Sequence, residues 1–122
     1  MIHAILDYLR AMDAGSLTED DINDILDGRD AEEFDSEWCR VDQEIESLKN
    51  DENYTSPNEK EHDDICKEAF FIIEERIPSE LSDYVSDDFG MIYDSIVLGY
   101  HDEWLSGMIN AYKEGRIPTG EI

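Results

Sequence analysis

Four residues carry side chains that together could form a zinc site: Cys39, His62, Cys66 and His101. His62 and Cys66 lie one helical turn apart, and with the other two they would supply the four ligands of a zinc site. Zinc sites, however, bring their ligands in close pairs, and only His62 and Cys66 come near that spacing. Cys66 also falls on an apolar helical stripe, where a buried free thiol is the common outcome. We therefore expect no metal site.

Two short motifs match known cofactor sites only in part. Glu59-x-x-His62 is half of a carboxylate-bridged di-iron signature, but such a site needs the motif twice. Asp94-Ser95-Ile96 resembles the Asp-Ser-Leu at which acyl carrier proteins receive phosphopantetheine, yet Ser95 falls within the densest apolar stripe. The sequence has no glycine-rich phosphate loop and no catalytic triad with supporting context. We therefore expect no cofactor, no catalytic residue and no enzymatic activity.

The densest apolar stretch of the chain is Phe89–Tyr112, where apolar residues recur at spacings of three and four. That spacing is typical of one buried helix face, or of two helices in series with a break at Gly99 and a cap at His101 or Asp102. The stretch contains few charges, so we interpret it as the scaffold on which the acidic helices pack. Trp38 and Trp104 lie on helical stripes and are expected in the core.

Periodicity and capping signals predict further helices in the rest of the chain. They are Ile2–Met12 before Gly15, a helix capped by Ser16 or Thr18 that ends at Gly28, a helix from Asp30 or Ala31 through Leu48, a helix with Ser56 as N-cap and Pro57 at N1 that ends at Pro78, and a short helix at Ser79–Ser86. A chain of 122 residues is most simply one domain. The sequence therefore predicts an all-α fold, a single-domain bundle of five to six helices over residues 1–122.

The chain is strongly acidic, with 33 Asp and Glu against nine Lys and Arg and a formal net charge of −24. Self-repulsion on this scale lowers folding stability, so it indicates a role outside folding. Free nucleic acid and anionic membrane surfaces are disfavoured as partners because they carry the same sign of charge. We expect a basic protein partner.

The acidic residues are concentrated before the apolar stretch. Leu17–Asp64 contains 19 acidic and four basic residues, whereas Phe89–Ile122 contains five and two. The lysines that usually offset acidic helix faces at i,i+4 are largely missing. A partner-binding surface is therefore predicted on the second and third helices, with an exposed Tyr54 as an aromatic anchor and Tyr100–Glu103 as an alternative face. The candidate residues are Asp20, Asp21, Asp24, Glu33, Glu37, Asp42, Glu44, Tyr54, Tyr100, Asp102 and Glu103.

In size, charge and helical character the chain resembles bacterial immunity proteins of the colicin and contact-dependent growth inhibition type. The resemblance concerns the whole chain and includes no motif, so it assigns no residue. It implies a stoichiometric inhibitor that covers the positively charged cleft of a nuclease toxin, or a nearby exosite, in a 1:1 complex. Two alternatives remain open: a DNA mimic that inhibits a restriction or CRISPR system, and a non-catalytic acidic adaptor.

The first ten residues contain Asp7 and Arg10 within an apolar run and begin with no basic leader. We therefore expect neither a signal peptide nor a membrane span. Two cysteines without a secretory signal indicate free thiols in a reducing compartment. The expected localisation is cytoplasmic.

Overall fold

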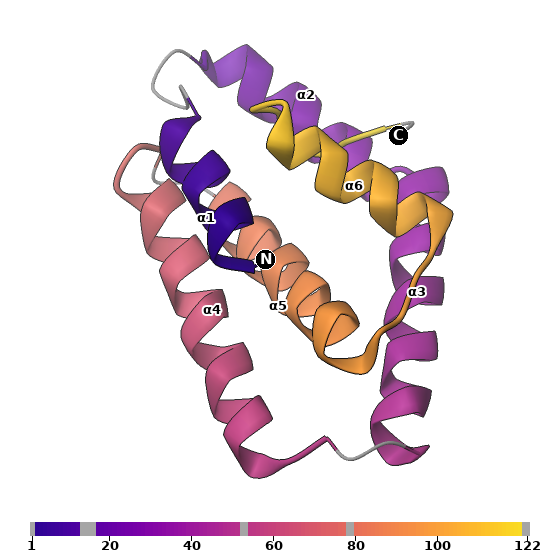
Figure 1. The fold of residues 1–122 in the computed structure, drawn as a ribbon. Coiled ribbons are helices and arrows are strands. Elements are labelled where there is room, and N and C mark those ends of the chain that lie inside the picture. Colours follow the sequence, from indigo (N-terminus) through magenta and orange to yellow (C-terminus); the bar gives the residue numbers. More distant parts are fainter. Residues whose placement is uncertain (1, 13–16, 52–53, 78–79, 121–122) are drawn as a thin grey trace.

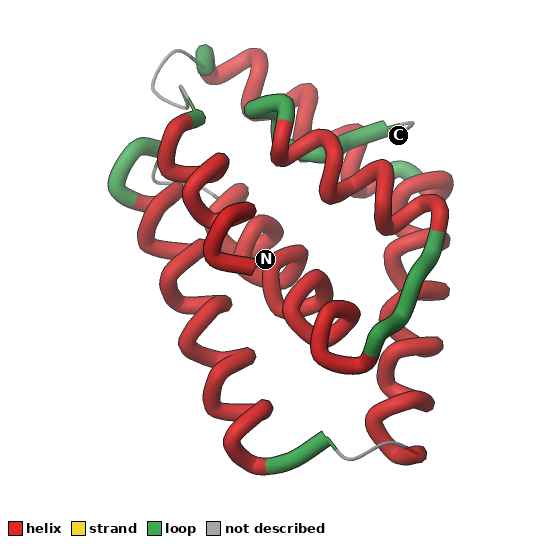
Figure 2. Tube along the Cα trace, in the orientation of Figure 1, coloured by secondary structure: helices red, strands yellow, loops and turns green. Residues whose placement is uncertain are grey.

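The computed structural model is all-α, as the sequence predicts (Figures 1 and 2). It describes residues 2–12, 17–51, 54–77 and 80–120, which contain six helices and no strand. The helices are α1 (Ile2–Ala11), α2 (Glu19–Asp30), α3 (Glu32–Asp51), α4 (Ser56–Glu74), α5 (Leu81–Leu98) and α6 (Glu103–Lys113). Within these residues, no helix combines the length and the hydropathy that a bilayer crossing requires.

Helix α5 lies in the middle of the fold, between α4 and α3 (Figure 1). Its side chains Leu81, Val85, Phe89 and Ile92 are fully buried and belong to one hydrophobic cluster that also includes residues of α1, α3, α4 and α6. The apolar stretch therefore does form the scaffold. The closest packing is with α4, and Gly90 permits it: a Cβ atom there would lie 2.7 Å from the Cys66 Sγ and 2.7 Å from the His62 Cε1.

Three of the predicted helix boundaries are confirmed by their capping geometry. The Thr18 side chain accepts a hydrogen bond from the backbone of Asp21 and caps α2. Gly99 ends α5 with a φ of 67°, a left-handed conformation that glycine adopts readily. Asp102 then caps α6 by accepting a hydrogen bond from the Leu105 N–H at 3.0 Å. The apolar stretch is thus two helices with a break between Gly99 and Asp102.

The predicted short helix at Ser79–Ser86 is wrong as a separate element. From residue 81 onward this segment is the first part of α5, because Leu81 and Val85 continue its buried stripe without interruption. Ser86 does not cap a helix. Its hydroxyl instead donates a hydrogen bond of 2.9 Å to the Cys66 carbonyl of α4.

The predicted N-cap of α4 is displaced by one residue. Thr55 is the N-cap, Ser56 is the first helical residue, and Pro57 follows it. The Thr55 N–H donates to the Asn58 side chain at 3.0 Å, so Asn58 closes the capping box in place of Glu59. Ser56 and Thr55 are both good caps, and local sequence alone does not separate them.

Gly28 lies inside α2 and does not end it, which corrects the predicted boundary. A Cβ atom at this position would lie 2.2 Å from the Thr119 Oγ1, so glycine is needed there for close packing of the C-terminal segment. The Thr119 hydroxyl also donates to the Ile25 carbonyl at 2.8 Å. The predicted ends at Gly15 and Pro78 lie outside the described residues.

Candidate functional site

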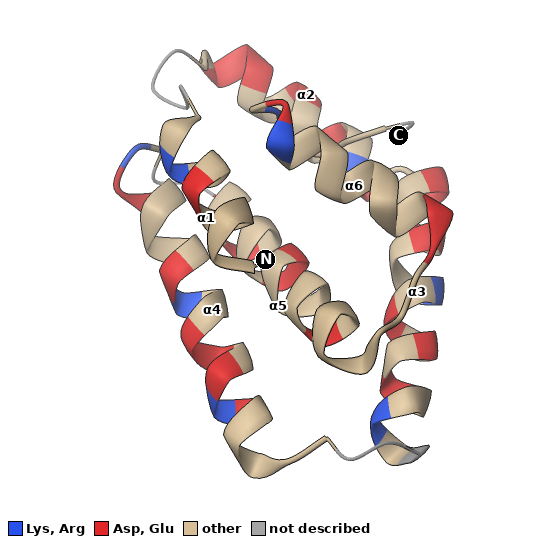
Figure 3. Ribbon diagram, viewed as in Figure 1, with Lys and Arg blue, Asp and Glu red and all other residues tan. Residues whose placement is uncertain are grey.

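Acidic side chains are dense on α2, α3 and α4 and sparse on α1 and α6 (Figure 3). Helix α3 divides part of this surface into two flanks, on either side of a buried stripe formed by Phe34, Val41 and Ile45. Because an α-helix has about 3.6 residues per turn, the positions beside this stripe point in opposite directions. We call Glu37, Arg40 and Glu44 the Arg40 flank. We call Asp35, Trp38 and Asp42 the Trp38 flank.

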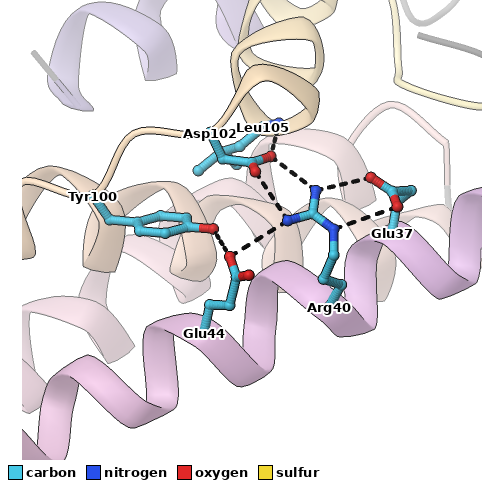
Figure 4. Close-up of polar contacts among 6 residues, drawn as sticks. All are labelled: Glu37, Arg40, Glu44, Tyr100, Asp102 and Leu105. Atoms are coloured by element: carbon cyan, nitrogen blue, oxygen red, sulfur yellow. Dashed lines mark hydrogen bonds and ion pairs between the residues drawn. The ribbon is translucent and has the colours of Figure 1, made fainter.

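On the Arg40 flank, one guanidinium gathers carboxylates from two helices (Figure 4). Arg40 donates to Glu37 through Nη2 at 2.8 Å, and to Asp102 through Nη1 at 3.0 Å and Nη2 at 3.2 Å. Its Nη1 also lies 3.4 Å from the Glu44 Oε2, and the Tyr100 hydroxyl donates to the same carboxylate. The two faces that the sequence predicts separately, one on α3 and one at Tyr100–Glu103, are therefore one surface.

The charge on this surface is held in place but not cancelled. Hydrogen bonds from Arg40 and from backbone N–H groups hold the pKa of Asp102 below its usual value, against an opposing effect of burial. Burial and the hydrogen bond to Glu44 raise the pKa of Tyr100 to about 12, so its hydroxyl stays a donor. Three carboxylates share a single cation, so the cluster remains negative at neutral pH.

The acids of α2 are placed elsewhere. Asp20, Asp21 and Asp24 are exposed, and no contact between described residues joins them to the Arg40 flank. Asp21 is used structurally: its carboxylate accepts from the Thr18 N–H at 2.9 Å, which lowers its pKa. Glu33 and Glu103 are exposed at the first turns of α3 and α6.

Tyr54 is half-buried, so the expectation of an exposed aromatic is wrong. Its hydroxyl donates to Asp94, and the Lys49 Nζ lies 4.8 Å from its ring centroid. Burial and the Asp94 hydrogen bond raise its pKa. Asp42 is half-buried on the Trp38 flank, away from Glu37 and Glu44.

Asp94 is a buried carboxylate that joins three helices, and the sequence reasoning missed it. It is 3 % exposed and pairs with the Lys49 Nζ of α3 at 2.8 Å and the His62 Nδ1 of α4 at 3.0 Å. Burial opposes its ionisation, but hydrogen bonds from His62, Lys49 and Tyr54 outweigh it and lower the pKa. The hydrogen bond to Asp94 raises the pKa of His62 to about 10. His62 is therefore a cationic partner in a structural cluster at neutral pH.

A second buried carboxylate, Asp88, pairs with Arg29 and was also missed. Arg29 donates to it twice, through Nη1 at 2.8 Å and Nη2 at 2.6 Å. The Tyr112 hydroxyl and the Trp38 indole N–H donate to the same carboxylate at 2.5 and 3.0 Å. Arg29 also donates to the Pro118 carbonyl at 3.0 Å. The available signal is an acidic residue directly before the apolar stretch, at 88, or inside it, at 94, because burying a lone carboxylate costs too much free energy.

Two of the residues considered for metal or cofactor binding, His62 and Ser95, form hydrogen bonds inside the fold. Among the described residues, no three His, Cys, Asp or Glu side chains are arranged to hold a metal ion. Cys39 and Cys66 are free thiols. Ser95 is buried, and its hydroxyl donates to the Ile92 carbonyl at 2.7 Å, so it is not presented to a modifying enzyme. Trp38 and Trp104, expected in the core, are half-buried at its edge.

Comparison with known families gives one match that spans nearly the whole chain. A family model described as Immunity protein PIM1 matches residues 2–119. No curated protein and no solved structure matched the chain.

Proposed function

The chain belongs to the Immunity protein PIM1 family, and from this premise we propose that it binds and neutralises a cognate bacterial toxin as a stoichiometric, non-catalytic inhibitor. An immunity protein has a toxin as its partner, and a tight inhibitor needs only a complementary surface. We propose that this surface includes the Arg40 flank together with Tyr100, Asp102 and the neighbouring Glu103.

The observation that carries this choice is the shared guanidinium of Arg40. Carboxylates on flexible side chains lose conformational freedom when a partner orders them, and this loss weakens binding. Here Glu37 and Asp102 already accept charge-assisted hydrogen bonds from Arg40. The flank is thus ordered before binding and still carries a surplus of negative charge. Tyr100 adds an aromatic ring beside the carboxylates, the residue type that most often anchors interfaces.

A net charge of −24 favours a basic toxin, and a nuclease is the most natural basic class. A nuclease cleft is positively charged because its substrate is polyanionic, so an acidic surface accelerates association and blocks the cleft or an adjoining exosite. We propose a 1:1 complex in the cytoplasm, where a nuclease would meet nucleic acid. Direct binding to nucleic acid or to an anionic membrane is opposed by the same charge.

Co-expression with the open reading frame immediately upstream tests the proposal. We expect a 1:1 complex by size-exclusion chromatography with light scattering, nanomolar affinity that weakens moderately at high salt, and loss of nucleic-acid cleavage by the toxin. Failure to bind any basic protein would contradict the toxin-inhibitor role. Inhibition of a toxin that cleaves no nucleic acid would contradict only the nuclease assignment. Competition by duplex DNA with a steep salt dependence would instead favour a DNA mimic.

The double variant Glu37→Gln/Glu44→Gln tests the proposed surface. Removing two of the carboxylates around Arg40 should weaken toxin binding about tenfold or more, mainly through slower association, because the basic partner loses its electrostatic complement. Glu75→Gln is a matched control, since Glu75 is exposed at the end of α4, on the other side of α5 (Figure 1). Equal affinities of the variant and the control in surface plasmon resonance would place the interface elsewhere.

A further inference from the structure

A hollow of about 220 Å³ opens beside the Trp38 flank, between α3 and the first half of α5. Its walls include the aromatic rings of Phe34, Trp38 and Tyr84, and Arg29 of α2 also lines it. Two carboxylates, Asp35 and Asp87, lie at its exposed edge. We call this feature the Trp38 hollow.

The hollow is built on a fixed floor. The Arg29 guanidinium carbon lies 4.6 Å from the Phe34 ring centroid and 5.1 Å from that of Tyr84. The bidentate pair with Asp88 offsets the charge of Arg29, and the Trp38 indole is fixed by donating to the same carboxylate. An occupant would therefore meet a preformed site whose cation is already neutralised, and little ordering would be needed on binding.

The edge of the hollow, in contrast, carries carboxylates without a cation. Neither the Asp35 nor the Asp87 side chain forms a hydrogen bond or an ion pair with another described residue. Partial burial of its carboxyl group and the charges of Asp88 and Asp83 raise the pKa of Asp87 and outweigh the opposing effect of Arg29, so its charge is unfavourable in the free protein. A cation brought to this edge would relieve that repulsion.

The floor also contains an unsatisfied donor. Arg29 is 4 % exposed, and its Nε is the single buried side-chain nitrogen or oxygen without a hydrogen-bond partner in the described part of the chain. Buried donors are nearly always paired in native proteins. The pair with Asp88 thus uses the two terminal nitrogens of Arg29 and leaves the Nε unpaired.

Size and charge restrict the occupant. Pockets that enclose small-molecule ligands measure about 300–1,000 Å³, so a hollow of about 220 Å³ suits one side chain better. A second copy of this chain is disfavoured because each copy carries a net charge of −24. Aromatic walls with a carboxylate edge are complementary to arginine, whose planar guanidinium stacks on indole and pairs with carboxylates.

We propose that the Trp38 hollow receives an arginine side chain of the cognate toxin, as a second anchor beside the Arg40 flank. This inference rests on the proposed function, because it names a contact within the same complex. The arginine guanidinium stacks on the Trp38 indole and pairs with both Asp87 and Asp35.

Affinity measurements of Asp87→Asn and Asp35→Asn with the co-expressed toxin test the inference. Each substitution should weaken binding about tenfold, because each removes a charge that pairs with the arginine. Asp63→Asn is the matched control: Asp63 is an exposed carboxylate of α4 that does not line the hollow, and its substitution should change affinity less than twofold. An alanine scan of toxin arginines should identify one whose loss is not additive with Asp87→Asn.

A fluorescence measurement gives an independent readout. Trp104→Phe leaves Trp38 as the only tryptophan of the chain, and its emission should change when the toxin arginine covers the indole. Two results together would overturn the proposal that the hollow binds a toxin arginine: unchanged emission, and affinities of Asp87→Asn and Asp35→Asn equal to that of Asp63→Asn. They would leave the inhibitor role intact. Absence of any complex with the wild-type chain would overturn both.

Discussion

The two flanks of α3 carry similar carboxylates, but these differ in their ion pairing and in the direction of their pKa shifts. On the Arg40 flank, three acids converge on one guanidinium, and the pKa of Asp102 is lowered by hydrogen bonds from Arg40. On the Trp38 side, Asp42 and Asp87 form no ion pair with described residues. Burial and neighbouring carboxylates raise the pKa of both. One flank is ordered by an internal cation, and the other lacks one.

This difference shows that a count of acids does not predict which carboxylates a partner can use. A carboxylate that already pairs with an internal cation presents a fixed geometry and attracts a basic partner at long range. Direct pairing with the partner then adds little binding free energy. A carboxylate without a cation gains most from pairing, because its charge is unfavourable until the partner arrives. The comparison therefore predicts fast association through the Arg40 flank and slow dissociation through the Trp38 hollow.

The largest effect should come from the floor of the Trp38 hollow. Arg29→Met leaves Asp88 buried without its cation and should lower the free energy of unfolding by about 3–5 kcal/mol. The matched control is Lys60→Met, because Lys60 pairs with Asp64 at 3.0 Å on an exposed surface and should contribute less than about 1 kcal/mol. Urea denaturation measures both. Equal losses would show that water reaches Asp88 and that the floor is not a dry, fixed base.

A smaller effect is expected from Arg40→Met, about 1 kcal/mol in unfolding free energy, because solvent screens this half-exposed cation. Its pH dependence follows from Asp102, whose pKa is lowered in the folded state. Stabilisation by a lowered pKa is complete above the unfolded value of about 3.9 and is lost as pH falls through the folded value. The difference between wild type and variant should therefore persist at pH 5 and shrink in stronger acid. A difference that grows on acidification would contradict this pairing.

The smallest effect should have the opposite sign. Asp87→Asn removes a charge whose pKa is raised in the folded state, so it should stabilise the free protein at pH 7 by no more than about 0.5 kcal/mol, because Asp87 is exposed. The gain should vanish as pH falls through that raised pKa, where the wild-type carboxyl also becomes neutral. Thermal unfolding of Asp87→Asn and Asp102→Asn at pH 7 gives the direct comparison. Destabilisation by both would remove the distinction between the flanks.

Local signals predicted the helices well, because capping and apolar periodicity act over a few residues. Thr18 caps α2, Gly99 ends α5 and Asp102 caps α6. The sequence indicates Gly99 directly, and it offers Thr18 and Asp102 each as one of two possible caps. The errors arose where a long-range contact decided the role of a residue. Glycine is a common residue type at helix ends, but Gly28 is a glycine because it packs closely against Thr119, a residue far along the chain.

The candidate surface was harder to predict for the same reason. Arg40 is surrounded in sequence by acids, and its pairing with Asp102 spans 62 residues. No local spacing reveals that the two meet. Tyr54 has the features of an exposed loop residue, yet Asp94, 40 residues away, accepts a hydrogen bond from its hydroxyl. Net charge and fold class can be predicted from the sequence. Which carboxylates are paired with a cation and which are free can be decided only from the fold.

The floor of the Trp38 hollow also has a consequence for the timing of synthesis. Arg29 emerges from the ribosome before most of its partners, since Pro118 lies 89 residues later in the chain. At about 5–20 residues per second, that interval is about 4–18 s. Until Tyr112 and Pro118 leave the exit tunnel, the Arg29–Asp88 pair lacks two of the groups that complete it. The nascent chain therefore has no complete Trp38 hollow until these two groups have emerged.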